Sequence, residues 1–148
     1  MGRAVVAGGL AAGFLDLTAA LVLYGLRGAR LIRIVQAIAS GLMGADAFKG
    51  GGATAALGVL LHFFIATAAA AVFVLASRVQ PALVRRPLLW GPVYGVVVYA
   101  VMNFVVVPLS AVARGPFNPQ LAAILVVIHM LCVGLPIALA ARRYAPAT

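Results

Sequence analysis

Four apolar stretches, each of about 20 residues or slightly more, set the strictest limit on how this chain can fold. They cover residues 4–26, 54–76, 87–110 and 119–141. A helix of that length crosses the hydrocarbon core of a bilayer, about 30 Å thick, with some tilt. Inside that core each backbone N–H and C=O group must be paired within the protein, which a helix achieves within one segment. The sequence therefore predicts an all-α membrane protein, a four-transmembrane-helix bundle forming a single domain over residues 1–148.

The composition also indicates that the bilayer is the solvent. Of 148 residues, 66% are hydrophobic and 9% are charged, whereas an average soluble domain is about half apolar and about one-quarter charged. A soluble domain of this size could not hide so much apolar surface, because small folds bury only part of theirs. Asp16 lies in the middle of the first stretch and arginines follow it, so we expect a retained span rather than a cleaved signal peptide.

The net charge of +9 comes from 11 basic residues and only 2 acidic ones. The basic residues lie almost entirely between the apolar stretches, a pattern typical of topology determinants and of contacts with anionic lipid headgroups. No basic stripe with interleaved aromatic residues occurs, so nucleic acid is not an expected partner. The residues predicted to lie at the membrane interface are Arg27, Arg30, Arg33, Arg85, Arg86, Arg142 and Arg143.

Proline residues mark several predicted helix features. Pro87 suits the first turn of the third span, and Asn118 followed by Pro119 suits an N-cap and first turn of the fourth. Pro92 and Pro136 lie inside spans, where each should weaken or kink its helix. A fixed bend that improves packing is favoured over a gating hinge at both positions.

The segment at residues 30–40 has polar and apolar sides at the helical period. The polar side holds Arg30, Arg33, Gln36 and Ser40, and the apolar side holds Leu31, Ile34, Val35 and Ile38. This segment is too short to cross a bilayer and lies directly between two predicted spans. We expect an additional interfacial amphipathic helix between spans 1 and 2. Gly41 and Gly44 should end it, and residues 45–53 should form a mobile return.

The basic residues also predict an orientation. One side of the predicted bundle carries Arg3, Arg78, Arg85, Arg86, Arg142 and Arg143. The other side carries nearly as many, but the first set lies flush with the span ends, where the positive-inside rule is most reliable. We therefore expect both termini to be cytoplasmic.

Four polar residues lie inside the predicted spans, where burying a polar side chain costs free energy. Each of them is therefore expected to have a structural or functional role. They are Asp16, His62, Asn103 and His129. A rise of about 1.5 Å per residue places Asp16 and both histidines near the bilayer midplane, and Asn103 nearer one face. An ionised Asp16 alone at that depth would be costly, so we expect it to be protonated or paired with a histidine.

Three interpretations of this buried polar seam stay open. The first is a proton or small-solute pathway, which makes a transport or proton-linked module the leading function. The second is a non-catalytic membrane subunit or lipid-interacting structural protein, in which the same residues only determine packing. The third, a lesser alternative, is a b-type haem held by His62 and His129. No cofactor, catalytic residue or metal site is otherwise predicted, since Asp16 and Asp46 are the only acids and Cys132 the only cysteine.

Small residues predict where helices approach closely. Gly9 and Gly13 form one Gly-x-x-x-Gly motif, and Gly91 and Gly95 form another. Residues 55–62 and 122–129 also look alike, each ending in histidine, which suggests two helical hairpins related by an axis along the membrane normal. Such small-residue surfaces could equally serve a homo-oligomer or a membrane-complex subunit.

Four segments carry a resemblance to known proteins: residues 13–16, 33–41, 101–110 and 129–136. Through them the chain resembles an uncharacterised family of small bacterial four-span inner-membrane proteins, distantly akin to the YagU-like proteins. The resemblance covers nearly the whole chain. It implies a multi-pass protein of the bacterial inner (cytoplasmic) membrane, and it brings no established activity and no functional residue.

Overall fold

The computed structural model describes residues 1–113 and 115–144, which are mostly helical and contain no strand. The α-helices are α1 (Gly2–Leu26), α2 (Leu31–Met43), α3 (Gly51–Val79), α4 (Ala82–Arg85), α5 (Pro87–Val101), α6 (Val107–Leu109), α7 (Pro119–Ile128) and α8 (Leu135–Tyr144). A 3₁₀ segment, η1 (Gly44–Phe48), and two π-helical segments, η2 (Met102–Val106) and η3 (His129–Gly134), adjoin them. The predicted all-α class is confirmed.

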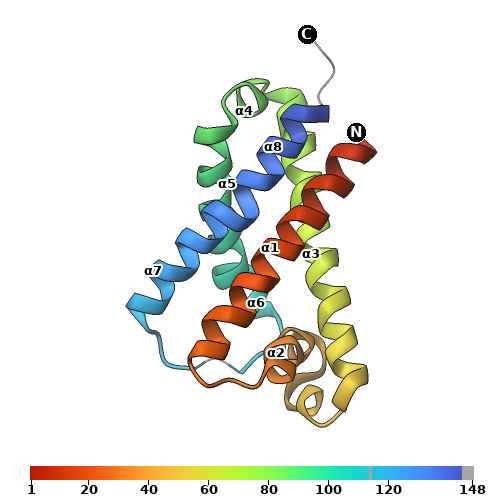
Figure 1. Cartoon of the computed structure of the whole chain (residues 1–148), viewed down its shortest axis with the longest axis vertical. Coiled ribbons are helices and arrows are strands. Elements are labelled where there is room, and N and C mark those ends of the chain that lie inside the picture. Colours follow the sequence, from red (N-terminus) through yellow and green to blue (C-terminus); the bar gives the residue numbers. More distant parts are fainter. Residues whose placement is uncertain (114, 145–148) are drawn as a thin grey trace.

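Four runs of helix lie lengthwise in the molecule: α1, α3, α5–η2–α6 and α7–η3–α8 (Figure 1). The start of α1 and the end of α8 lie together, since the guanidinium carbon of Arg3 is 5.3 Å from the ring centre of Tyr144. We call this the termini end. At the opposite end, α2 is seen nearly end-on in Figure 1 and lies across the bundle. We call this the α2 end.

Five helical segments are long and apolar enough to cross a membrane, by length and composition. They are Gly2–Leu26, Leu31–Phe48, Gly51–Val79, Pro87–Leu109 and Pro119–Tyr144. Large apolar side chains such as Phe14, Phe64, Leu88 and Phe104 are exposed on the surface. These features are compatible with a multi-pass membrane protein.

The helix after α1 is longer in the structure than the sequence predicted. Helix α2 continues through Gly41 to Met43, and its C-cap Gly44 has a φ of +59°, a conformation that glycine adopts readily. Residues 45–48 then continue as the 3₁₀ segment η1, and α3 already begins at Gly51. The predicted mobile return is therefore mostly helical, and α2 with η1 is 18 residues long.

The predicted polar side of α2 is also only partly right. Arg30 and Arg33 are exposed, but Gln36 and Ser40 are buried. The Gln36 amide donates to the Gly51 carbonyl at 3.0 Å and to Thr54 Oγ1 at 3.2 Å. The first turn of α3 thus offers acceptors that let a polar side chain be buried at little cost. These bonds hold α2 against α3.

The starts of the third and fourth long helices agree with expectation, whereas α3 extends three residues beyond its predicted span at each end. Helix α5 begins at Pro87 and α7 at Pro119, where the Asn118 side chain accepts the Leu121 N–H at 3.0 Å. Helix α5 continues unbroken through Pro92. Each π-helical segment comes just before a proline, Pro108 or Pro136. A proline lacks an N–H and crowds the carbonyl one turn earlier, and π-helical widening is a common way to accommodate such a disturbance.

The main cluster of buried apolar residues lies toward the termini end, between α1, α3, α5 and α8. Phe73 and Ile137 are its largest buried aliphatic or aromatic side chains, and alanines fill most of the remaining positions. A methyl group on Gly9 would lie 2.6 Å from Thr67 Oγ1, and one on Gly95 would collide with the His129 carbonyl. Both predicted Gly-x-x-x-Gly motifs are therefore confirmed as sites of close helix approach.

Candidate functional site

A cavity of about 550 Å³ lies between α1, α2, α3 and the η2–α6 segment, in the half of the molecule nearer the α2 end. Its size is within the range of pockets that bind small molecules. Its wall is mainly aliphatic, as in Leu17, Ile34, Ile38, Leu61, Ile65, Met102 and Val106. Five polar or charged residues also line it: Asp16, Tyr24, Arg33, His62 and Ser110.

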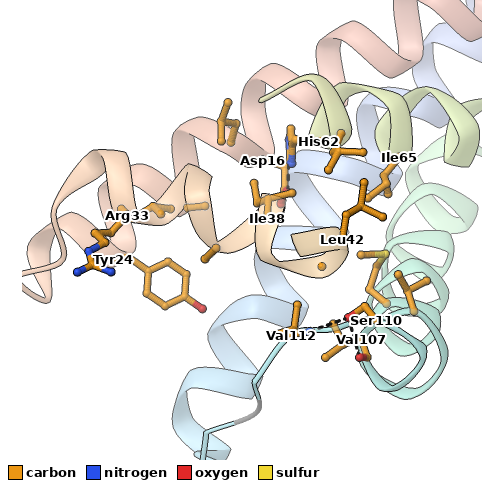
Figure 2. A pocket seen from close by; sticks show the side chains of 18 of the residues that line it. Asp16, Tyr24, Arg33, Ile38, Leu42, His62, Ile65, Val107, Ser110 and Val112 are labelled. Carbon is orange, nitrogen blue, oxygen red and sulfur yellow. Dashed lines mark hydrogen bonds and ion pairs between the residues drawn. The ribbon is translucent and has the colours of Figure 1, made fainter. Parts of the chain in front are cut away.

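Asp16 and His62 point toward one another at this cavity (Figure 2). His62 Nε2 lies 2.9 Å from the Gly13 carbonyl oxygen and 4.0 Å from Asp16 Oδ2. Because a carbonyl only accepts, Nε2 carries the proton of this hydrogen bond. The Asp16 contact is too long for a hydrogen bond and becomes an ion pair when the imidazole is protonated. The Asp16 and His62 side chains are 19% and 14% exposed, so both are largely withdrawn from the surface.

Gly13 explains how His62 reaches α1. A methyl group at Gly13 would lie 2.6 Å from Cδ1 of Phe63, so a side chain there would displace the Phe63 ring and loosen the contact between α1 and α3. Asp16 follows Gly13 by almost one helical turn and therefore faces the same side of α1. The glycine thus permits the helix crossing that places an acid and an imidazole side by side.

Asn103 and His129 lie on a different seam, beside Tyr99 of α5. His129 Nδ1 bonds with the Leu125 carbonyl at 2.8 Å, and its ring meets the Tyr99 ring edge-on at 5.4 Å between centres. Asn103 Nδ2 donates to the Tyr99 carbonyl at 2.9 Å. Both residues lie at the start of a π-helical segment and bond to the carbonyl one turn earlier in their own helix. Of the four predicted polar residues, the structure brings together Asp16 and His62.

The two histidines make separate contacts. The cavity that His62 lines is not lined by His129, and the backbone of Gly95 lies directly against the His129 carbonyl. The haem hypothesis stays a prediction. Among the described residues, no group of three His, Cys, Asp or Glu could hold a metal ion.

Tyr24 and Arg33 are cavity residues that the sequence did not reveal as such. Arg33 was expected at the membrane interface, and it is exposed, with its guanidinium carbon 5.1 Å from the ring centre of Phe48. The turn at Gly28, with a φ of +88°, sends α2 back beside α1 and brings Arg33 to the cavity. Gly28 was the sequence feature that could have indicated this turn. The direction of the turn depends on how α2 packs on α3.

The predicted interfacial arginines flank helix ends at both ends of the molecule. Arg27, Arg30 and Arg33 adjoin the turn between α1 and α2. Arg85 ends α4, Arg86 precedes α5, and Arg142 and Arg143 lie in the last turn of α8. Both acids already face another residue: Asp46 Oδ1 is 2.8 Å from Lys49 Nζ, and Asp16 faces His62.

Comparison of the chain with protein-family models, curated proteins and solved structures finds no match. The resemblance to small bacterial inner-membrane proteins stays a prediction.

Proposed function

We propose that this chain is a small transport or proton-linked membrane module, in which Asp16 and His62 bind the proton and the adjoining cavity binds the solute. The observation that carries this proposal is the pairing of a largely buried acid with an imidazole at 4.0 Å, on the wall of a cavity of about 550 Å³. Ionisable groups in such surroundings are typical of proton relays and substrate pathways.

The proposal includes four transmembrane runs with α2 lying along the membrane surface. An even number of crossings brings both chain ends to one side, and the contact between Arg3 and Tyr144 agrees with this. Helix α2 lies across the bundle in Figure 1 and exposes Arg30 and Arg33, as an interfacial helix would. The arginines of the termini end support cytoplasmic termini, and the proposed location is the bacterial inner membrane.

The chemistry of the pair suits proton-linked binding. In a mainly aliphatic cavity an isolated carboxylate would be costly, but a nearby imidazolium offsets that cost. Adding or removing one proton changes the charge of the pair by one unit, where a low dielectric makes charge more effective than in water. The Gly13 carbonyl holds the imidazole in place. Protonation would thereby alter the affinity of the cavity for a charged solute.

At the α2 end, Ala29, Ser110 and Val112 contribute to the lining of the cavity. Beyond Asp16, toward the termini end, Gly8 packs within about 3.5 Å of Ala70 and Ala140, as measured from the methyl group that Gly8 lacks. The cavity therefore lies toward the α2 end, and α1 packs closely on α3 and α8 at Gly8, toward the termini end. Transport would require these contacts to open.

A second candidate is a non-catalytic subunit or lipid-interacting structural protein, alone or as a homo-oligomer. One observation favours it: the shortest contact of His62 Nε2 is to a backbone carbonyl of α1 and not to Asp16. In that case the pair would only stabilise the crossing of α1 and α3.

Proton flux into liposomes distinguishes the two candidates. Purified protein is reconstituted with a pH-sensitive dye inside, and a pH gradient is imposed across the membrane. We expect faster acidification than in protein-free liposomes, loss of that flux in Asp16→Asn, and full flux in the matched control His129→Phe. A wild-type rate equal to that of protein-free liposomes, or full flux in a folded Asp16→Asn variant, would reject the transport proposal and leave the structural one.

A further inference from the structure

We propose that the solute of this cavity is an anionic membrane lipid. Its headgroup would bind at Arg33, with support from Arg27 and Arg30, and one acyl chain would enter the cavity. This inference rests on the proposed function, because it names the molecule that the cavity takes.

The first argument for an anionic lipid is the charge balance of the chain. The chain has 11 basic residues and 2 acidic ones, and both acids already face Lys49 or His62. Arg27, Arg30 and Arg33 follow one another around the α1–α2 turn, and within the described residues none of them forms an ion pair with a carboxylate. Their counter-charge must therefore come from outside the chain, and anionic lipid headgroups supply it at a membrane surface.

The second argument is the position of Arg33 at the cavity. Among these three arginines, Arg33 lines the cavity, and Figure 2 shows it beside Tyr24, on one side of the cavity and apart from Asp16 and His62. Its exposed guanidinium presents several donors suited to the oxygens of a phosphate group. An anionic group and an apolar cavity entrance thus meet at one side chain.

The third argument is the apolar character of the cavity wall. Beyond Arg33 most of the surface contributed by α2 and α3 is aliphatic, formed by residues such as Ile34, Ile38 and Leu61, and His62 is the polar exception. A small polar metabolite would lose its water and gain few hydrogen bonds against such a wall, whereas an acyl chain gains from burial there.

The same residues indicate that the charge of the headgroup is negative. A lipophilic cation would meet the positive charge of Arg33 at the entrance, and the acid that could receive it, Asp16, already faces His62. An anionic headgroup is attracted at the entrance and stays away from Asp16. The bilayer is the source, because the exposed Leu31 and Ile32 adjoin Arg33 on α2 and suit contact with lipid.

Photolabelling tests this inference directly. The protein is placed in nanodiscs containing phosphatidylglycerol or phosphatidylcholine with a photoreactive group near the end of one acyl chain. After illumination, labelled positions are mapped by mass spectrometry. We expect labelling of Ile38, Leu61 and Met102, with about fivefold more from phosphatidylglycerol, since one basic residue near the surface contributes roughly that preference.

Three variants locate the two parts of the lipid. Arg33→Gln should remove most of the phosphatidylglycerol preference of cavity labelling, and the exposed position of Arg33 means that the fold should be retained. Ala37→Phe should fill the cavity and abolish labelling inside it while leaving labelling of the outer residue Phe64. Arg86→Gln, at the termini end, is the matched control and should leave cavity labelling unchanged.

Equal cavity labelling by the two lipids, no labelling inside the cavity, or no effect of Arg33→Gln would each overturn the inference. A cationic lipid that labels the cavity more strongly than phosphatidylglycerol would overturn it too. The outcome is separable from the proton-flux test. Flux without lipid preference rejects the lipid alone, whereas lipid preference without flux rejects transport alone.

Discussion

His62 and His129 end similar eight-residue segments, yet the structure uses them differently. His62 bonds across a helix crossing to the Gly13 carbonyl and faces Asp16 at a cavity. His129 bonds within its own helix to Leu125 and contacts the edge of the Tyr99 ring. We call the first contact region the α1–α3 seam and the second the α5–η3 seam. The same local pattern therefore makes a polar site only where a second helix supplies a polar partner.

The two seams also differ in how their glycines are used. In the α5–η3 seam, backbone meets backbone: a methyl group on Gly134 would collide with the Gly91 carbonyl and the Gly95 backbone. In the α1–α3 seam, Gly13 faces the ring of Phe63, a side chain that can shift. At Gly13 the α1–α3 seam is therefore closed by a side chain, whereas the α5–η3 seam at Gly134 is closed by main chain.

The largest expected effect is that of Gly134→Leu in the α5–η3 seam. The new side chain has no space between η3 and α5, so we expect the free energy of unfolding to fall by about 3 kcal/mol or more. Denaturant unfolding in mixed micelles measures this. Gly52→Ala is the control, since a methyl group there meets nothing within 4 Å. Equal stability of Gly134→Leu and wild type would show that the helices are not in backbone contact.

Gly13→Ala should have a smaller effect, because the Phe63 ring can move aside. We expect a loss of about 1–2 kcal/mol, together with reduced proton flux as α3 moves and His62 leaves the Gly13 carbonyl. Unfolding and flux are measured on the same preparation. A destabilisation as large as that of Gly134→Leu would remove the distinction between the two seams.

The smallest effects compare the two histidines themselves. Each of His62→Phe and His129→Phe removes one hydrogen bond to a carbonyl, which contributes about 1 kcal/mol. The stabilities of the two variants should therefore fall by similar amounts, whereas only His62→Phe should abolish proton flux. If both variants keep full flux, the α1–α3 seam has only a structural role.

The sequence alone was enough for the features that depend on local chemistry. The apolar stretches indicated the helices, Pro87 and Pro119 marked two helix starts, and the Gly-x-x-x-Gly motifs identified close crossings. Each depends on backbone hydrogen bonding or side-chain size, which are properties of neighbouring residues in the chain. Asp16 and His62 could also be recognised as unusual, because polar groups stand out in apolar helices.

Which helix faces meet was determined by tertiary packing. Lipid is as apolar as a protein interior, so the long helices carry little contrast between an inner and an outer side. The sequence therefore left both histidines as equal partners for Asp16, and the crossing at Gly13 selected His62. In α2, the first turn of α3 determined that Gln36 is buried while Arg33 stays exposed at the cavity. A π-helical segment adds a residue to a turn and rotates the rest of its helix by about 100°, which the residue pattern did not reveal.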